Sequence, residues 1–199
     1  MAVKRILRSK GSSGFSLLEL LLAMALGLSL FGVILQALIH DGQNGMRFAR
    51  LLRERAFQRR ALELVKSDLR WAEAMALDPS ASSPACSLSG REAVLHLETQ
   101  AGAITYSLGQ PPSKIWRGVV LMRCGPVYGL QGELTTGGAA INRVVLDGLD
   151  GAGQESFVAA VDGHARHLRL ALRQSFSAGQ RQQRIASEAL VDLTGLELL

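Results

Sequence analysis

Hydrophobic positions gather in one long run near the start of the chain. The run covers residues 20–39, and four small or polar residues interrupt it: Gly27, Ser29, Gly32 and Gln36. As a helix, this segment would span roughly 30 Å, the thickness of a bilayer's hydrocarbon core. The pattern therefore predicts one transmembrane helix.

Charged residues on the two sides of this run predict its orientation. A basic segment with Lys4, Arg5, Arg8 and Lys10 precedes it, and no Lys or Arg follows until Arg47. Because basic flanks remain in the cytoplasm, we expect a single crossing with the C-terminal part outside. A secretory signal peptide is the alternative. The run exceeds the roughly 7 to 15 apolar residues of such a peptide, and no small-x-small cleavage site closes it.

Helical periodicity resumes beyond a turn-like patch at residues 41–45, which is expected to bend or loosen the helix. Apolar residues then step by three and four positions and line one helix face: Leu62, Val65, Leu69, Ala72 and Ala76. The helix is expected to stop by Asp78-Pro79, because proline cannot continue it. Residues 41–77 are thus predicted as the exported amphipathic half of the helix. Residues 78–90, rich in Pro, Ser and Ala, are predicted as a loop.

Residues 91–199 have the pattern of a β-rich globular domain. Apolar or alternating segments separated by Gly-rich breaks predict strands over residues 91–97, 104–108, 115–123, 143–146, 157–161, 168–173 and 185–193. The segment 168–173 gives the clearest signal because apolar and polar residues alternate in it. Parts of residues 126–142 are expected to be irregular. A long N-terminal helix packed on an antiparallel sheet belongs to the α+β class.

A carboxylate stands at the head of the apolar run, at Glu19. A charge at this depth costs about 2.5 to 3.5 kcal/mol on insertion scales. We therefore expect Glu19 to have a use, most simply pairing with another charge. The alternative is that it snorkels to the lipid headgroups at the helix end.

The residues around Glu19 carry a family resemblance. A basic leader ends in Gly14, Phe15 follows, three residues of Ser or apolar type come next, and then Glu19 and the apolar run. This pattern resembles the class III signal of type IV pilins and type II secretion pseudopilins, and it covers residues 1 to about 40. The resemblance implies that a prepilin peptidase removes residues 1–14 by cleaving between Gly14 and Phe15. It also implies N-methylation of the new Phe15 amine.

The resemblance gives Glu19 a role in assembly. Within one helix, the Phe15 amine and Glu19 are near neighbours because they lie four residues apart. In a filament, the Glu19 carboxylate would instead meet the Phe15 amine of an adjacent subunit, which is the pairing that the family implies. Residues 15–40 would then be both membrane anchor and assembly helix. The implied partners are other pilin or pseudopilin subunits, the prepilin peptidase, an inner-membrane assembly platform and membrane lipid.

A second, looser resemblance concerns the middle of the helix. The segment of residues 62–74, which contains Val65-Lys66-Ser67-Asp68-Leu69-Arg70, resembles minor pilins of the PilW class and minor pseudopilins of the J class. This implies a low-copy subunit that primes assembly or lies near the tip. The expected location is the inner membrane, with the C-terminal domain periplasmic or extracellular, and then the pilus or pseudopilus.

Two other classes of function remain open at this stage. The chain could be a single-pass anchored, exported binding domain that enters no filament, or an anchored, exported enzyme. The sequence has no Gly-x-Ser-x-Gly elbow and no Walker loop, which argues against an enzyme, and we predict no cofactor. The chain holds 22 basic and 17 acidic residues, for a net charge of +5. Loss of the leader would leave +1, so direct nucleic-acid binding is not predicted.

Two further features concern the exported part. Cys86 and Cys124 are expected to form a disulfide rather than remain as two free thiols, because the compartment is oxidising. The acids Asp147, Asp150 and Glu155 lie in a Gly-rich segment and offer a weak calcium site. They lack EF-hand spacing, so turns that use Asp side chains explain them more simply.

Arginines and tryptophans complete the candidate residues. The arginines crowd the start of the exported helix: Arg47, Arg50, Arg53, Arg55, Arg59 and Arg60. They could contact anionic headgroups or acidic partner subunits, or form a solvated helix face. Trp71 and Trp116 are expected in the core or at an interface.

Overall fold

A computed structural model of the chain describes residues 16–78, 83–151, 155–162, 166–178 and 181–199. The predicted processing residues Gly14 and Phe15 lie outside this described part. By its internal contacts the chain divides into two units, residues 1–46 and 47–199, and each is described by itself.

A single helix, α1 (Leu17–Trp71), contains 55 residues and contributes to both units. Its sequence contains no proline and is rich in Leu, Ala, Arg and Glu, which all favour helix. The patch at residues 41–45 was predicted to bend or loosen the helix, but it is helical in the structure. Gly42 and Gly45 each lower helix stability by only about 1 kcal/mol relative to alanine, and neither introduces a steric clash that would prevent helix formation.

The part of α1 in the first unit is exposed along its whole described length, residues 16–46. Its most apolar window has a mean hydropathy of 2.3, and none of that window is buried. The helix is therefore long enough and apolar enough to cross a membrane.

The helix ends at Trp71 and the chain continues directly into strand β1 (Ala72–Ala76). The prediction that the helix runs to residue 77 was therefore wrong. Ala72 and Ala76 continue the helical period of Leu62, Val65 and Leu69, but β1 pairs with β2 on one side and β9 on the other. Strand pairing at both edges outweighs the local preference of an Ala-rich segment for helix.

Nine strands form one sheet in the described part of the chain. They are β1 (Ala72–Ala76), β2 (Glu92–Thr99), β3 (Ile104–Gly109), β4 (Val119–Gly125), β5 (Ile141–Leu149), β6 (Phe157–Asp162), β7 (His167–Ala178), β8 (Arg181–Asp192) and β9 (Glu197–Leu198). The order is β6-β7-β5-β4-β3-β2-β1-β9, and β8 pairs with β7.

The seven predicted strands correspond to β2 through β8, although their bounds differ. The largest error is at the end of β7, which continues to Ala178 and not to residue 173. β4 begins four residues later than predicted, at Val119, and β8 begins four residues earlier, at Arg181. β1 and β9 were not predicted, and their pairing is parallel, so the sheet is mixed and not purely antiparallel. Residues 126–140 lie outside the named strands, as expected in part, with one bridge between Tyr128 and Leu134.

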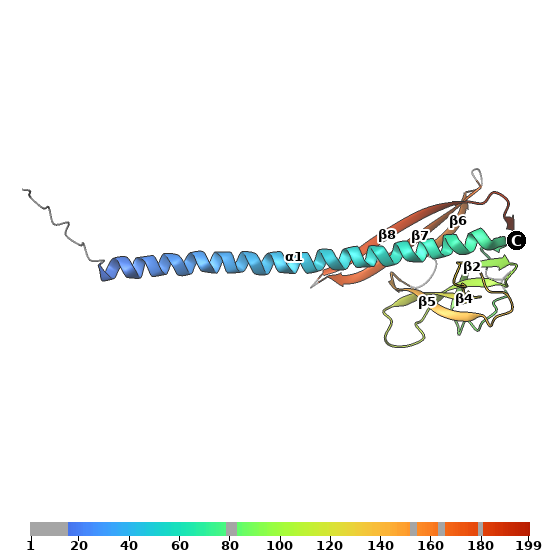
Figure 1. Ribbon diagram of the computed structural model, residues 1–199, viewed down its shortest axis with the longest axis horizontal. Helices are drawn as coiled ribbons and strands as arrows, with labels where there is room; N and C mark the ends of the chain where they lie inside the picture. The colour runs from blue at the N-terminus through green and yellow to red at the C-terminus, as the bar shows by residue number, and fades with distance from the viewer. Residues whose placement is uncertain (1–15, 79–82, 152–154, 163–165, 179–180) are drawn as a thin grey trace, which may run out of the picture. The chain divides into compact units, whose positions relative to one another are not determined.

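The core of the second unit lies between the last turns of α1 and one face of the sheet. Ala61, Leu62, Val65 and Leu69 are buried on one side of the helix, four residues that the period of the sequence places on one face. They pack with apolar side chains from β1 through β7, in one cluster. Figure 1 shows the strands beside this part of α1. A long apolar N-terminal helix followed by a curled sheet domain is the α+β arrangement predicted, and it is pilin-like in its general arrangement.

Candidate functional site

Glu19 lies in the first turn of α1, where the sequence places a capping motif. Ser16 precedes the helix, and its Oγ accepts a hydrogen bond from the Glu19 backbone N–H at 3.2 Å. The Ser16 carbonyl accepts the first helical bond, from the Leu20 N–H at 3.2 Å. Ser-x-x-Glu is the capping-box pattern, so Ser16 satisfies one of the free amides at the helix start. Glu19 itself is exposed, and its carboxylate makes no hydrogen bond or ion pair within the described residues.

The buried face of α1 in the second unit carries three polar residues among its apolar ones. They are Glu54, Gln58 and Asp68, and all three are less than 5 % exposed. A buried polar group without a partner costs free energy comparable to a lost hydrogen bond, and a buried charge costs more. Each of the three is therefore expected to meet a partner on the sheet, and each does.

Asp68 is the centre of the most buried polar cluster. It accepts hydrogen bonds from Arg123 Nε at 2.6 Å and Arg123 Nη2 at 2.9 Å, which form a bidentate pair. Tyr106 and Tyr128 donate their hydroxyls to the same carboxylate, at 2.5 and 2.6 Å. Arg123 also donates to the Pro126 carbonyl at 2.8 Å. One helical carboxylate thus ties together β3, β4 and the segment that follows β4.

The environment of Asp68 shifts the pKa of each of its donors. Burial, with the negative Asp68 beside it, raises the pKa of Tyr106 well above its ordinary value. The same two causes raise the pKa of Tyr128 to about 12. Burial is the largest single influence on Arg123 and opposes its charge, but hydrogen bonding and charge attraction to Asp68, with smaller contributions from the two tyrosines, together outweigh it, so the pKa of the guanidinium is raised. The cluster therefore holds one carboxylate, one guanidinium and two neutral phenols at physiological pH.

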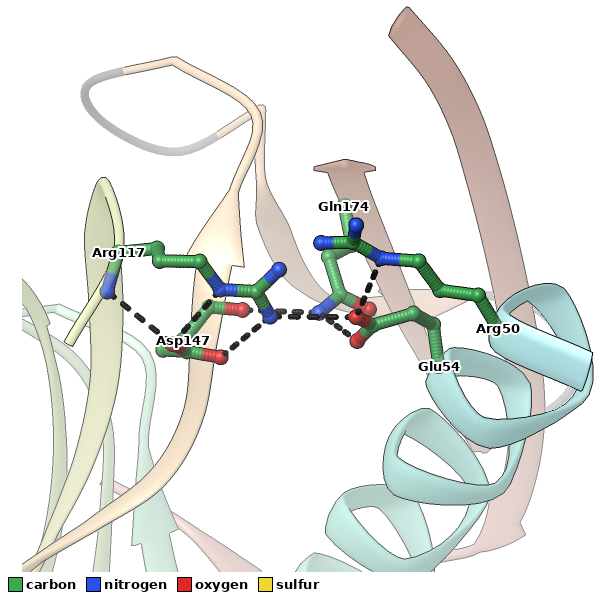
Figure 2. A network of polar contacts seen from close by, with 5 residues as sticks. All are labelled: Arg50, Glu54, Arg117, Asp147 and Gln174. Carbon is green, nitrogen blue, oxygen red and sulfur yellow. Dashed lines mark hydrogen bonds and ion pairs between the residues drawn. The ribbon is translucent and has the colours of Figure 1, made fainter. Parts of the chain in front are cut away.

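Glu54 is the centre of a second cluster, shown in Figure 2, nearer the start of the second unit. Its carboxylate accepts hydrogen bonds from Arg117 Nη2 at 3.2 Å and from Gln174 Nε2 at 3.1 Å. Arg117 also binds Asp147 in β5, through its backbone N–H, Nε and Nη2. Hydrogen bonding to Asp147 is the largest cause that raises the pKa of Arg117. Arg50 approaches Glu54 at 3.9 Å from one turn earlier on the helix.

Gln58 lies between these two clusters on the same face of α1. Its Nε2 donates to the Ile185 carbonyl of β8 at 3.4 Å, and its Oε1 accepts from Ser187 Oγ at 2.7 Å. The helix therefore meets the sheet through a line of three polar contacts with apolar residues between them. This line fixes the rotation and the register of the last helical turns against the sheet, because each contact has a specific geometry.

Sequence reasoning did not single out Glu54, Gln58 or Asp68 as site residues. The signal was available, since all three fall in the same stripe as Leu62 and Val65 when the residues are placed at 100° intervals. A polar residue inside an apolar stripe predicts a buried partner. What the pattern could not supply was the identity of the partner, which lies 38 to 129 positions away in the chain.

The two cysteines of the sequence prediction form a disulfide bond, Cys86–Cys124. It links the segment after β1 to strand β4 across 38 positions of sequence. Asn142 in β5 donates to the Ser87 carbonyl at 3.1 Å, beside the disulfide. The segment 83–90 is thereby attached to the sheet at two neighbouring places.

Two of the three acids considered for a calcium site form ion pairs with arginines, and the third is exposed. Asp147 pairs with Arg117 at 3.2 Å, and Asp150 pairs with Arg184 at 2.9 Å. Glu155 is exposed, and residues 152–154 between it and Asp150 lie outside the described part. Within the residues that are described, no group of three or more acidic, His or Cys side chains is placed to hold a metal ion.

The arginines of the helix divide into two sets. Arg50 contacts Glu54 and lies over the Phe176 ring, with 5.8 Å between the guanidinium carbon and the ring centroid. Arg53, Arg55, Arg59 and Arg60 are exposed, and none has an ion pair within the ranges described.

The tryptophans were expected in the core or at an interface. Neither is in the core, since Trp71 is 47 % exposed and Trp116 is 36 % exposed.

No family model matches the chain, and neither a curated protein nor a solved structure was found to be similar to it.

Proposed function

We propose that the protein is a minor pilin or pseudopilin, a structural subunit that a prepilin peptidase processes and that joins a filament through its N-terminal helix. The observation that carries this proposal is the combination at the start of α1. A basic leader that ends in Gly14 is followed by Phe15 and then by a capped helix, with an acid in its first turn and a membrane-length apolar run behind it.

The state of Glu19 supports a role in assembly. Ser16 already satisfies the Glu19 backbone N–H, while the carboxylate is exposed and has no partner among the residues described. In a low-dielectric environment, burying an unpaired carboxylate costs much more free energy than burying one that is paired with a positive charge. The free Phe15 amine that cleavage creates on a neighbouring subunit would be a partner of opposite charge.

The sheet domain supports the same proposal from the other end of the helix. Every buried polar residue of α1 is bonded to the sheet, so the last turns of the helix are fixed to their own domain. The apolar side chains from Leu17 to Ile39 are exposed, and they are free for lipid before assembly and for other helices after it. The family resemblance of residues 62–74 to minor pilins of the PilW class and J-class minor pseudopilins favours a low-copy subunit that primes assembly or lies near the tip.

The deciding experiment is intact mass measurement with N-terminal sequencing of the protein from its native membrane. It is made in cells with the prepilin peptidase and in matched cells without it. We expect a chain that begins at N-methylated Phe15 in the first cells and a chain that retains residues 1–14 in the second.

Three results would overturn the proposal in whole or in part. A chain that keeps residues 1–14 although the peptidase is present would indicate an anchored, exported domain that enters no filament. A chain cut after Ile39 would indicate an ordinary secreted domain. A chain processed at Phe15 but absent from purified filaments would leave the processing intact and remove the structural role.

A further inference from the structure

A pocket of about 330 Å³ opens where α1 ends. Arg70 and Trp71, the last two residues of the helix, form one wall, and Glu73 of β1 continues it. The turn between β2 and β3, at Gln100, and the segment around Leu134 supply the rest of the lining. The volume falls within the range of small-molecule sites, which is about 300 to 1,000 Å³. No residue of the line of polar contacts along α1 takes part in it.

Trp71 gives this pocket a large apolar surface that the fold does not bury. It is 47 % exposed, although the neighbouring Leu69 is only 5 % exposed. Ala72, Ala101 and Leu134 add further apolar lining. An exposed indole at the wall of a pocket offers a flat face to the apolar face of a ring-shaped ligand.

The polar groups of the pocket combine both signs of charge. Gln100 Nε2 donates to Glu73 Oε1 at 2.8 Å, which holds the two side chains together. Glu133 also lines the pocket and accepts from the Gln131 N–H at 3.1 Å. Arg70 is exposed and, in the described part of the chain, has no ion pair. The rim therefore offers carboxylate acceptors together with guanidinium and amide donors.

This mixture of charges selects among ligand classes. An anionic ligand would meet Glu73 and Glu133, and a cationic ligand would meet Arg70, so each would face repulsion from part of the rim. A neutral polyhydroxylated ring satisfies both kinds of group, because each hydroxyl both donates and accepts. Hydrogen bonds to charged groups are about twice as strong as neutral ones, which suits the recognition of hydroxyls.

We propose that this pocket binds a neutral sugar residue, with the apolar face of the ring on Trp71 and its hydroxyls on the Glu73–Gln100 pair and on Arg70. The proposal does not depend on filament assembly, because every lining residue belongs to the sheet domain or to the last turn of α1. It adds a ligand class to the exported domain, which the N-terminal helix does not specify.

The chain's two tryptophans allow a direct test. In the full-length Trp116→Phe variant, Trp71 is the sole source of tryptophan fluorescence. This variant, in a detergent without a sugar headgroup, is titrated with the methyl glycosides of glucose, galactose and N-acetylglucosamine and with disaccharides of the same sugars. We expect a saturable change in emission for at least one of them, with a Kd of about 1 mM, ordinary for a ligand of this size.

Matched variants separate binding from folding. By isothermal calorimetry, Trp71→Ala is expected to weaken binding at least about tenfold, whereas Trp116→Ala, at the other half-exposed tryptophan, should leave it unchanged. Glu73→Gln, at an exposed position of β1, removes the carboxylate that the proposal assigns to the sugar without touching the end of the helix, and it should weaken binding about threefold or more. Circular dichroism confirms that each variant is folded.

The charged probes glucuronate and lysine amide complete the design and are expected not to bind. The proposal is overturned if no neutral sugar gives a saturable response up to about 50 mM, well above the expected Kd. It is equally overturned if only a charged probe binds, or if Trp71→Ala and Trp116→Ala weaken binding alike.

Discussion

Arg123 and Asp68 form a bidentate ion pair between strand β4 and helix α1, with Nε–Oδ2 at 2.6 Å and Nη2–Oδ1 at 2.9 Å. Both side chains are almost wholly removed from solvent, at 6 % and 0 % exposure. A buried pair of this kind adds little net stability compared with apolar residues of the same shape. It does make any other register costly, because sliding the helix would leave two unpaired charges in the core.

The first prediction concerns the loss of one charge from this pair. Asp68→Asn leaves Arg123 charged and buried without a counter-ion, and we expect it to lower the free energy of unfolding by about 3 to 5 kcal/mol. The measurement is chemical denaturation of the full-length chain in detergent. Glu63→Gln is the matched control, because Glu63 is an exposed acid on the same helix that pairs with Lys66 at 2.9 Å.

The control variant should change the free energy of unfolding by no more than about 0.5 kcal/mol. The double variant Asp68→Leu with Arg123→Met removes both charges together and should recover part of the stability lost in Asp68→Asn. The recovery is incomplete because the hydroxyls of Tyr106 and Tyr128 lose their acceptor. Equal effects of Asp68→Asn and Glu63→Gln would show that the buried pair does not hold the helix in place.

The second prediction uses the two tyrosines, which are the only ones in the sequence and both donate to Asp68. The pKa of each is raised in the folded protein, to about 12 for Tyr128, first by burial and then by Asp68. The unfolded chain loses these protons near pH 10, as free tyrosine does. Above that pH the unfolded state binds fewer protons, so stability falls as the pH rises.

Ultraviolet absorbance of tyrosinate measures this titration directly. We expect no ionisation step near pH 10 in the folded protein, and we expect the free energy of unfolding to decline from about pH 10 upward through about 12. In Asp68→Asn the ionisation of Tyr128 should move to lower pH, because the nearby negative charge is gone. Two ordinary ionisations near pH 10 in the folded wild type would contradict the arrangement.

Much of the fold follows from patterns that are local in the sequence. The apolar run of residues 20–39 and the stripe through Leu62 and Val65 predicted α1, and the alternation at residues 168–173 predicted β7. The errors fall where pairing partners are distant. The segment of β1, Ala72–Ala76, looks helical by composition, and only β2 and β9 make it a strand.

The polar contacts along α1 were less accessible to sequence reasoning than the fold. The position of Asp68 in the same helical stripe as Val65 marks it as buried, but Arg123 lies 55 positions away and Tyr128 lies 60. Nothing local distinguishes Arg123 from the other arginines of the chain. For the two tryptophans the sequence left the core and an interface open, and the fold excludes the core because both are partly exposed.

The third prediction concerns the disulfide Cys86–Cys124, which closes a loop across 38 positions. In the chain-entropy model, removing a crosslink of this length lowers the free energy of unfolding by about 3 to 4 kcal/mol. We expect the double variant Cys86→Ala with Cys124→Ala to unfold at a lower temperature than the wild type. A reductant should lower the wild-type transition toward that of the variant and leave the variant unchanged. A wild type indifferent to reductant would show that the bond contributes no stability.

The last prediction separates two roles of Glu19, which the structure makes distinguishable. Glu19 is the fourth residue of a Ser-x-x-Glu capping box, and Ser16 accepts the hydrogen bond of its backbone N–H. A glutamine at this position keeps a hydrogen-bonding side chain and removes the charge, whereas an alanine removes both. The Ser16 bond to the backbone N–H is expected to survive either change. If Glu19 pairs with the amine of a neighbouring subunit, Glu19→Gln and Glu19→Ala should both reduce incorporation into purified filaments. We expect about tenfold or more, the scale of one charge-assisted hydrogen bond.

Both variants should still be cleaved before Phe15, which separates assembly from processing. Normal incorporation of Glu19→Gln together with loss in Glu19→Ala would show that the Glu19 side chain acts through a hydrogen bond that needs no charge, and the pairing of charges between subunits would be wrong.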